Sequence, residues 1–332
     1  MAPETSTPKA SQELIKQAQE RLNAIRKEIG KVIVGQSHLI DSLLIAIFTE
    51  NHLLLEGVPG VAKTLAANTL AKIIHCDFKR VQFTPDLLPA DLIGTPLYNQ
   101  KEGTFTVKKG PVFTNILLAD EINRAPAKVQ SALLEIMQER QVTIGTETYK
   151  APTPFIVIAT QNPIEQEGTY PLSEAQTDRF MLKVKIPYPS RQEEKLILSR
   201  MGTLGELPSV SPILKLEDLS EFKQLVESIY LDDTVVEYIL SIVLSTRHPK
   251  EFSVPIEGLL DYGASPRATI ALKQAVKAHA LLAGRNFVTP QDVKEMAYDV
   301  LRHRLRLSYE AEAENQSAND IVKLILDAIP VP

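Results

Sequence analysis

Cysteine, tryptophan and aromatic residues are scarce in this sequence, and each shortage excludes a class of protein. Of 332 residues, one is cysteine (Cys76), none is tryptophan, and aromatic residues make up 6%. A single thiol forms neither a disulfide framework nor a thiolate zinc site. So few aromatic residues offer no obvious platform on which nucleic-acid bases could stack.

Long apolar runs and long basic runs are absent as well. No segment approaches the ~20 uncharged apolar residues that a membrane-spanning helix needs. The N-terminal segment has no apolar stretch typical of a secretory signal, so we expect a cytoplasmic protein without a membrane span. The formal net charge is −5, from 36 basic and 41 acidic residues. This balance disfavours a nucleic-acid partner, because phosphate binding favours a basic face.

The length and the 44% hydrophobic content predict about two domains. We expect a disordered tail over residues 1–10, an α/β domain over 11–188 and a helical domain over 189–332. Near-continuous apolar strands that alternate with helices indicate a parallel sheet buried on both faces. The five expected strands are Leu53–Leu55, Arg80–Phe83, Asn115–Ala119, Pro154–Ala159 and Met181–Ile186.

Two segments interrupt this alternation of strands and helices. Tyr98–Lys108 and Gln141–Lys150 each place a glycine between short β-prone runs, which predicts a β-hairpin. Their composition leaves open whether the hairpins serve the function or are ordinary surface structure.

The strongest chemical signal is Gly57-Val-Pro-Gly-Val-Ala-Lys-Thr64, between an expected strand and an expected helix. In this context backbone N–H groups and a helix N-terminus can hold a phosphate. Lys63 would reach the β- and γ-phosphates, and the Thr64 hydroxyl would ligate Mg²⁺. Ala62 stands where glycine is usual, and we expect binding to survive because a methyl group fits the first helical turn. The alternative is a chance Gly/Pro turn.

Polar side chains follow two other expected strands. Asp120 and Glu121 come after Asn115–Ala119, and Asn162 closes the polar stretch Thr160-Gln-Asn162 that comes after Pro154–Ala159. At the carboxyl edge of a sheet, Asp120 would hold Mg²⁺ through water, and Glu121 would activate the attacking water as a general base. Asn162 could orient that water. Each of these residues could instead belong to a turn or a helix cap.

Three arginines lack obvious partners nearby in the sequence. Arg179 precedes the last expected strand, Arg267 follows Pro266 at the start of a helix, and Arg124 follows the two carboxylates. An arginine can stabilise charge on a transferring phosphoryl group. The alternative for each is a surface salt bridge.

These stretches together resemble the AAA+ ATPases, and within them the MoxR family. The resemblance covers roughly residues 11–332, and the block Ala159–Phe180 is its most specific part. The stretches that carry it are Gly57–Thr64, Asp120–Ala125, Ala159–Phe180, Tyr262–Ala268 and Leu301–Leu305.

The resemblance implies an AAA+ P-loop domain with a five-stranded parallel sheet and β-hairpin inserts, followed by an all-α lid domain. Lys63 and Thr64 match the Walker A motif of the family, Asp120 and Glu121 match Walker B, and Asn162 matches sensor 1. The implied cofactors are ATP and Mg²⁺, and the two hairpins would face a central pore or a partner.

The resemblance also assigns the two arginines and the base-binding segment. Arg179 resembles the arginine finger that enters a neighbouring subunit's site, and Arg267 resembles sensor 2, with action in cis or in trans left open. The adenine would contact Val32–Gln36. The expected nucleotide-binding residues are Val34, Gly35, Gly57, Val58, Pro59, Gly60, Val61, Ala62, Lys63, Thr64 and Leu65.

The function implied by the resemblance is ATP-driven, chaperone-like remodelling of partner proteins. Members of the family form rings, usually hexamers, and many act with a protein that carries a von Willebrand factor A domain. Two alternatives remain. A nucleotide-gated scaffold with little hydrolysis is suggested by Ala62. A DNA-dependent motor is disfavoured by the acidic net charge.

Overall fold

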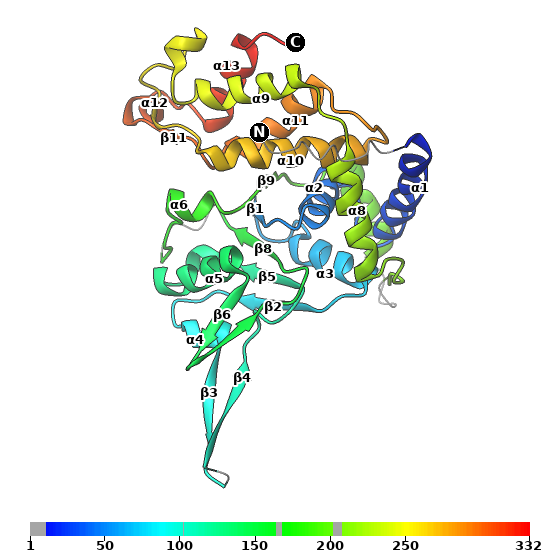
Figure 1. The fold of residues 1–332 in the computed structure, drawn as a ribbon, viewed down its shortest axis with the longest axis vertical. Coiled ribbons are helices and arrows are strands. Elements are labelled where there is room, and N and C mark those ends of the chain that lie inside the picture. The colour runs from blue at the N-terminus through cyan, green and yellow to red at the C-terminus, as the bar shows by residue number, and fades with distance from the viewer. Residues whose placement is uncertain (1–10, 102, 164–167, 202–207) are drawn as a thin grey trace, which may run out of the picture.

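A five-stranded parallel sheet forms the centre of the molecule, in the order β2-β5-β8-β1-β9 (Figure 1). The computed structural model describes residues 11–101, 103–163, 168–201 and 208–332, so the tail expected over 1–10 lies outside the described residues. The predicted parallel sheet is confirmed, with strand ends shifted by one or two residues. The strands are β1 (Leu53–Gly57), β2 (Phe78–Gln82), β5 (Ile116–Asp120), β8 (Ile156–Gln161) and β9 (Leu182–Ile186).

Helices cover both faces of this sheet. Successive strand residues point to opposite faces, so Leu53 and Leu55 join one apolar cluster and Leu54 joins another. The first cluster contains side chains of α1, α2 and α3, and the second contains those of α4 and α5. These helices are α1 (Gln12–Ile29), α2 (Ser37–Phe48), α3 (Lys63–Ile74), α4 (Pro89–Ile93) and α5 (Ala127–Glu139).

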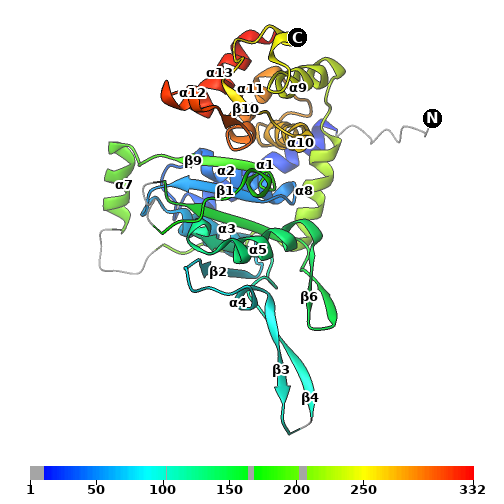
Figure 2. The same ribbon diagram turned by 90° about the vertical axis from the view of Figure 1, so that its left-hand side faces the viewer.

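Both predicted hairpins are present, and both are antiparallel. The hairpin of β3 (Gly94–Asn99) and β4 (Thr104–Lys109) projects from the sheet on the side away from the C-terminal helices (Figures 1 and 2). The hairpin of β6 (Gln141–Ile144) and β7 (Glu147–Lys150) leaves the body beside it. Each turn contains a glycine with positive φ, Gly103 and Gly145.

The C-terminal part is helical, as predicted, and helices α8–α13 are called the lid below. The expectation that strands end before residue 189 is wrong for one short antiparallel pair, β10 (Leu260–Tyr262) and β11 (Arg306–Leu307). Strands of three and two residues are too short to show an alternating pattern. The other elements from α6 on are α6 (Glu174–Thr177), α7 (Arg191–Met201), α8 (Leu216–Ser228), α9 (Asp233–Ser245), α10 (Pro266–Leu282), α11 (Pro290–Leu301), α12 (Tyr309–Ala313) and α13 (Ala318–Ala328).

The lid packs directly on the helices of the α/β part. One apolar cluster runs from Ile15 in α1 to Ile329 at the end of the chain, and Phe48 of α2 stacks on Phe222 of α8 with ring centroids 4.3 Å apart. The domain boundary near residue 188 therefore stays a prediction, because apolar packing continues across it. Among the described residues, no helix has the length and apolarity of a membrane span.

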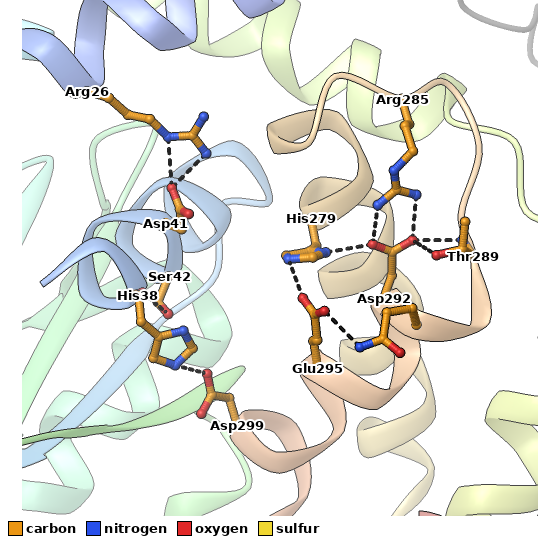
Figure 3. Close-up of polar contacts among 11 residues, drawn as sticks. Arg26, His38, Asp41, Ser42, His279, Arg285, Thr289, Asp292, Glu295 and Asp299 are labelled. Atoms are coloured by element: carbon orange, nitrogen blue, oxygen red, sulfur yellow. Dashed lines mark hydrogen bonds and ion pairs between the residues drawn. The ribbon is translucent and has the colours of Figure 1, made fainter.

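Polar contacts accompany this packing (Figure 3). His38 Nε2 of α2 lies 2.7 Å from Asp299 Oδ2 of α11, and this carboxylate raises the pKa of His38. Inside the lid, Asp292 accepts hydrogen bonds from His279, Arg285 and Thr289. Burial acts to raise the pKa of Asp292, but these donors outweigh it and hold the pKa well below its usual range.

His52 joins three elements inside the α/β part. It directly precedes β1; its Nδ1 accepts a hydrogen bond from Val157 N of β8 (3.0 Å), and its Nε2 bonds the Met137 carbonyl of α5 (3.1 Å). The first contact requires an unprotonated Nδ1 and the second requires an Nε2–H, so the neutral ring suits both. Burial lowers the pKa of His52 to about 3.

Replacing His52 with leucine leaves the Val157 N–H and the Met137 carbonyl unpaired in the core. We expect the free energy of unfolding at neutral pH to fall by about 2–6 kcal/mol, at roughly 1–3 kcal/mol for each unpaired group. The unfolded chain takes up a proton on His52 below pH 6.5, whereas the folded chain does so only near pH 3. The contribution of His52 is therefore complete above pH 6.5 and is lost as the pH falls toward 3, by about 1.4 kcal/mol per unit.

Urea denaturation at neutral pH and near pH 5 measures both effects. The stability gap between wild type and His52→Leu should narrow at the lower pH, because only the wild type loses the contribution of His52. The exposed His248 provides the control, since His248→Leu should follow the wild type at both pH values. A gap that stays constant with pH would contradict a neutral buried His52.

Candidate nucleotide site

The carboxyl ends of β1, β5 and β8 border one cleft of about 500 Å³. Neighbouring parallel strands end at the same edge of a sheet, which is where open α/β folds bind ligands. The cleft brings together most of the residues predicted to bind nucleotide and metal. Those that line it are Val34, Pro59, Gly60, Val61, Ala62, Lys63, Thr64, Leu65, Asp120, Glu121 and Asn162.

The loop between β1 and α3 depends on two glycines for different reasons. A Cβ at Gly57 would lie 3.0 Å from the carbonyl oxygen of Ile186, so the missing side chain lets β9 approach closely. A Cβ at Gly60 would meet nothing within 4 Å, but its φ of +85° is a conformation that side chains disfavour. Gly57 and Val58 do not line the cleft, and Val58 packs against the apolar cluster instead.

Ala62 does not lie in the first helical turn, which corrects the reason given for its tolerance. It is the N-cap of α3, with φ +63° and ψ +20°, a left-handed conformation. That region costs a non-glycine residue about 1–2 kcal/mol. A glycine would adopt this conformation without that cost. The loop therefore has its left-handed N-cap at the expense of backbone strain at Ala62.

Lys63 is the first residue of α3, and its ammonium faces back toward the loop. Nζ donates a hydrogen bond to the carbonyl of Gly57, the last residue of β1. Burial lowers the pKa of Lys63, while the carboxylates of Asp120 and Glu121 act in the opposite direction. The ammonium therefore lies between the loop and the carboxylates, as a phosphate-binding lysine requires.

Asp120 ends β5 and is only 8% exposed. Its Oδ1 accepts a hydrogen bond from Thr160 Oγ1 (2.6 Å), and its Oδ2 accepts two from Arg80, from Nε (3.0 Å) and Nη2 (2.7 Å). Thr160 Oγ1 also accepts a hydrogen bond from the backbone N of Glu121 (2.9 Å). The Thr160 hydroxyl thus fixes both residues at the end of β5.

Glu121 follows in a left-handed conformation, with φ +56°. Its Oε2 accepts hydrogen bonds from Gln82 Nε2 (2.8 Å) and from Arg124 Nη1 (3.0 Å). A strained backbone at a cleft is typical of functional residues, and here it turns Glu121 out of the strand direction. Arg124 therefore contacts the predicted general base in this structure.

The donor groups at this edge suit a magnesium ion that is completed by phosphate and water. The oxygens available are the Thr64 hydroxyl and the Asp120 carboxylate, and hard oxygen ligands are those that Mg²⁺ prefers. Within the described residues there is no cluster of three or more His, Cys, Asp or Glu that could hold a metal by itself. Mg²⁺ commonly binds through one or two protein ligands plus substrate phosphates.

Part of the cleft lining is apolar. It consists of Val32, Ile33 and Val34 before α2 and of Ile197 of α7. Such a surface can hold a flat base. The predicted Gly35 (φ +66°) does not line the cleft, and its Cα instead lies against the Glu193 carboxylate of α7.

Arg179 and Arg267 lie outside the cleft and together line a second hollow of about 210 Å³. Arg179 Nε donates a hydrogen bond to Gln138 Oε1 (3.2 Å), and Arg267 Nη1 lies 3.7 Å from Asp178 Oδ2. Ser265 caps α10, because its Oγ accepts a hydrogen bond from the backbone N of Arg267. The Ser265 hydroxyl also donates a hydrogen bond to Asp178 Oδ2 (2.9 Å). This capping places the start of α10 beside the segment that carries Arg179.

Three polar residues were not predicted as site residues: Arg80 and Gln82, which line the cleft, and Thr160, which holds Asp120 and Glu121 from below the surface. Arg80 and Gln82 lie two residues apart on β2 and therefore share one face of the sheet. The one signal in the sequence was the presence of polar residues within an expected apolar strand. Thr160 lies within β8 as the last residue of its buried run, but in the sequence a hydroxyl there gives no signal that distinguishes it from a turn residue.

Two families of known proteins match this chain. The ATPase family associated with various cellular activities (AAA) matches residues 52–182, and the AAA lid domain matches residues 256–325. The first match spans the loop, the carboxylates and Asn162. The second spans most of the lid and includes Arg267.

Individual relatives cover nearly the whole chain. Chaperone MoxR1 of Mycobacterium tuberculosis is 47% identical over 92% of this chain and 81% of its own length, and the uncharacterized protein YeaC of Bacillus subtilis is 44% identical over 92% and 93%. A crystal structure of a candidate ATPase from Cytophaga hutchinsonii is 50% identical, covers 96% of this chain and 97% of its own, and superposes with a TM-score of 0.90. The chain therefore belongs to the MoxR family of AAA+ ATPases.

Proposed function

We propose that this protein binds ATP with Mg²⁺ in the cleft and hydrolyses it to ADP and phosphate, in order to remodel partner proteins. The observation that supports this proposal is the cleft itself. Its phosphate-type loop, the carboxylates of Asp120 and Glu121, and Asn162 all face one space at the carboxyl edge of the sheet.

The roles of the residues follow from their positions. Backbone N–H groups of the loop and the N-terminus of α3 would hold the phosphates, and Lys63 would add a positive charge beside them. When bound through Thr64 and Asp120, Mg²⁺ would neutralise charge that develops on the phosphates. Glu121 would accept a proton from the attacking water, and Asn162 would orient that water.

The two arginines of the second hollow would act on the nucleotide of an adjacent protomer. Arg179 and Arg267 share that hollow, and neither lines the cleft of its own chain. Both side chains would then complete a neighbour's site, and for Arg267 we propose action in trans. Such an arrangement requires an oligomer, and we propose the hexameric ring that the family resemblance implies.

The partners are proposed on two grounds. One relative is named a chaperone, which fits protein clients, and the resemblance implies a partner with a von Willebrand factor A domain. The β3–β4 hairpin carries exposed apolar side chains, Leu97, Tyr98 and Phe105, away from the lid, which suits contact with another protein. The cytoplasmic location expected from the sequence stays a prediction.

A scaffold that binds ATP with little hydrolysis is the second candidate. The left-handed Ala62 favours it, because the strain lies next to the lysine that must approach the phosphates. Steady-state phosphate release at several protein concentrations separates the two. Turnover that rises with concentration supports the assembled ATPase, whereas absent turnover with intact ATP binding supports the scaffold.

Replacing Glu121 with glutamine removes the proposed general base and keeps the size of the side chain. We expect ATP turnover to fall by about 10²–10⁴-fold, the usual contribution of a general base, while ATP affinity stays within about threefold because Glu121 does not hold the phosphates. Phosphate release and calorimetry measure the two quantities. Glu135→Gln, at an exposed position of α5, is the matched control and should retain full turnover. Unchanged turnover in Glu121→Gln would remove Glu121 as the base.

Replacing Arg179 with alanine should abolish turnover, by about 10³-fold or more, with nucleotide affinity largely retained. The test of action in trans mixes two inactive variants, Arg179→Ala and Glu121→Gln. At some interfaces of a mixed ring, an intact Glu121 faces an intact Arg179, so turnover should partly return. Arg267→Ala mixed with Glu121→Gln should behave in the same way.

The exposed Arg191 of α7 provides the control for loss of a positive charge, because Arg191→Ala should remain active. A mixture that stays inactive, although size-exclusion chromatography shows mixed oligomers, would place the arginines on their own protomer's nucleotide. Full activity of Arg179→Ala alone would exclude a finger role for Arg179.

A further inference from the structure

Arg80 binds the carboxylate of Asp120, which is one of the two proposed protein ligands of Mg²⁺. Its guanidinium donates two hydrogen bonds to Asp120 Oδ2, and Thr160 donates one to Oδ1. A carboxylate has about two acceptor positions on each oxygen, so Arg80 fills both positions of Oδ2 and Thr160 leaves one on Oδ1. A hydrated Mg²⁺ that bound Asp120 through Oδ2 would compete with Arg80.

Arg80 is also placed so that it can move. β2 is an edge strand of the sheet, the Arg80 side chain is 50% exposed, and it lines the cleft together with Lys63. Asp120 is the opposite case, because its side chain is 11% exposed and the Thr160 hydroxyl holds it. Of the two partners, the arginine is therefore the one free to shift when a cation arrives.

A second contact holds Arg80 in its present place. Nη2 donates a hydrogen bond to Gln82 Oε1 (3.0 Å), and the amide of Gln82 donates in turn to Glu121 Oε2 (2.8 Å). Two neighbouring side chains of β2 therefore engage both carboxylates at the end of β5. The contacts of Arg80 with Asp120 and Gln82 are charge-assisted hydrogen bonds of a half-exposed side chain, and phosphate oxygens can replace their acceptors.

We propose that Arg80 is the built-in counter-cation of the magnesium site. It neutralises Asp120 when Mg²⁺ is absent, and it turns toward the phosphates when Mg²⁺ takes the carboxylate. Arg80 is thus a positioning residue that sets how strongly nucleotide binding depends on Mg²⁺. The inference rests on the proposed binding of ATP in this cleft.

Removing Arg80 should therefore change how strongly the affinity for the nucleotide depends on Mg²⁺. Without Arg80, the Asp120 carboxylate would repel a metal-free triphosphate, so binding without Mg²⁺ should weaken. With Mg²⁺ present, the substitution removes two opposing effects, the competition of Arg80 for Asp120 and the contact of the turned Arg80 with the phosphates, so binding should change much less than it does without Mg²⁺. A residue that only supported the fold would weaken both kinds of binding together.

Calorimetry with the non-hydrolysable analogue adenylyl imidodiphosphate measures this linkage. The analogue is titrated into the full chain in excess EDTA and in excess magnesium. The quantity compared between variants is the dissociation constant in EDTA divided by the dissociation constant in magnesium. We expect Arg80→Gln to raise this ratio by about tenfold or more relative to wild type, the effect of one charge-assisted contact. Arg80→Lys keeps the charge and should return the ratio close to the wild-type value.

Lys79→Gln is the matched control. Lys79 has the same charge and is the neighbouring residue on β2, but it points to the other face of the sheet and does not line the cleft. Its ratio should equal that of the wild type. Arg80→Met, which keeps the aliphatic stem without the charge, should give the same increase as Arg80→Gln, and it carries the test if the glutamine variant does not fold.

The outcomes distinguish the inference from the function on which it rests. If wild type binds the analogue and both Arg80→Gln and Arg80→Met keep its ratio within about twofold, Arg80 does not compete with Mg²⁺ and the inference falls alone. If wild type binds the analogue in neither buffer, nucleotide binding in the cleft is wrong and the inference falls with it. An equal rise in Lys79→Gln would show a general effect of charge and would also overturn the role of Arg80.

Discussion

Parallel pairing of three buried strands is the constraint on which the candidate site depends. β8 lies between β5 and β1, so the carboxyl ends of all three strands meet at one edge. The same pairing brings Thr160 beside Asp120, where its hydroxyl bonds the carboxylate and the next backbone N–H. Apolar residues that fill both faces of the sheet thus determine the distance between the loop and the carboxylates. A shift of one residue in this register would turn these side chains to the opposite face.

The sequence predicted the sheet and most of the cleft because both follow from local patterns. Short apolar runs fixed the strands to within one or two residues, and the loop and carboxylates stand directly after such runs. The second hollow was not predictable in this way. Arg179 and Arg267 are far apart in the chain, and they meet because Ser265 caps α10 and bonds Asp178. That contact crosses the interface between the lid and the sheet, which no sequence pattern describes.

Arg80 and Gln82 were missed for a related reason. The run Arg80–Phe83 was predicted to be an apolar strand of a sheet buried on both faces, and that pattern assigns no role to its polar members. Their partners are the carboxylates of Asp120, which ends β5, and of Glu121, which follows it, forty and thirty-nine residues away in the chain. Ala62 was expected in the first helical turn, but it is the left-handed N-cap one position earlier, and an alanine gives no sign of that conformation in the sequence.

The charges of the cleft bear on why the proposed hydrolysis would use a second set of arginines. In this structure Arg80 balances Asp120, Arg124 balances Glu121, and Lys63 lies against the loop carbonyl. A triphosphate adds more negative charge than Lys63 alone can balance, so the metal and a released Arg80 would have to share it. Under the proposed mechanism, charge that develops on the transferred phosphoryl group would call for a further donor. Arg179 and Arg267 are held together by the junction of lid and sheet, on a different surface of the same chain. A neighbour's arginines could therefore reach the phosphates only when the neighbour's lid and sheet are correctly packed, which would couple hydrolysis to the shape of the assembly.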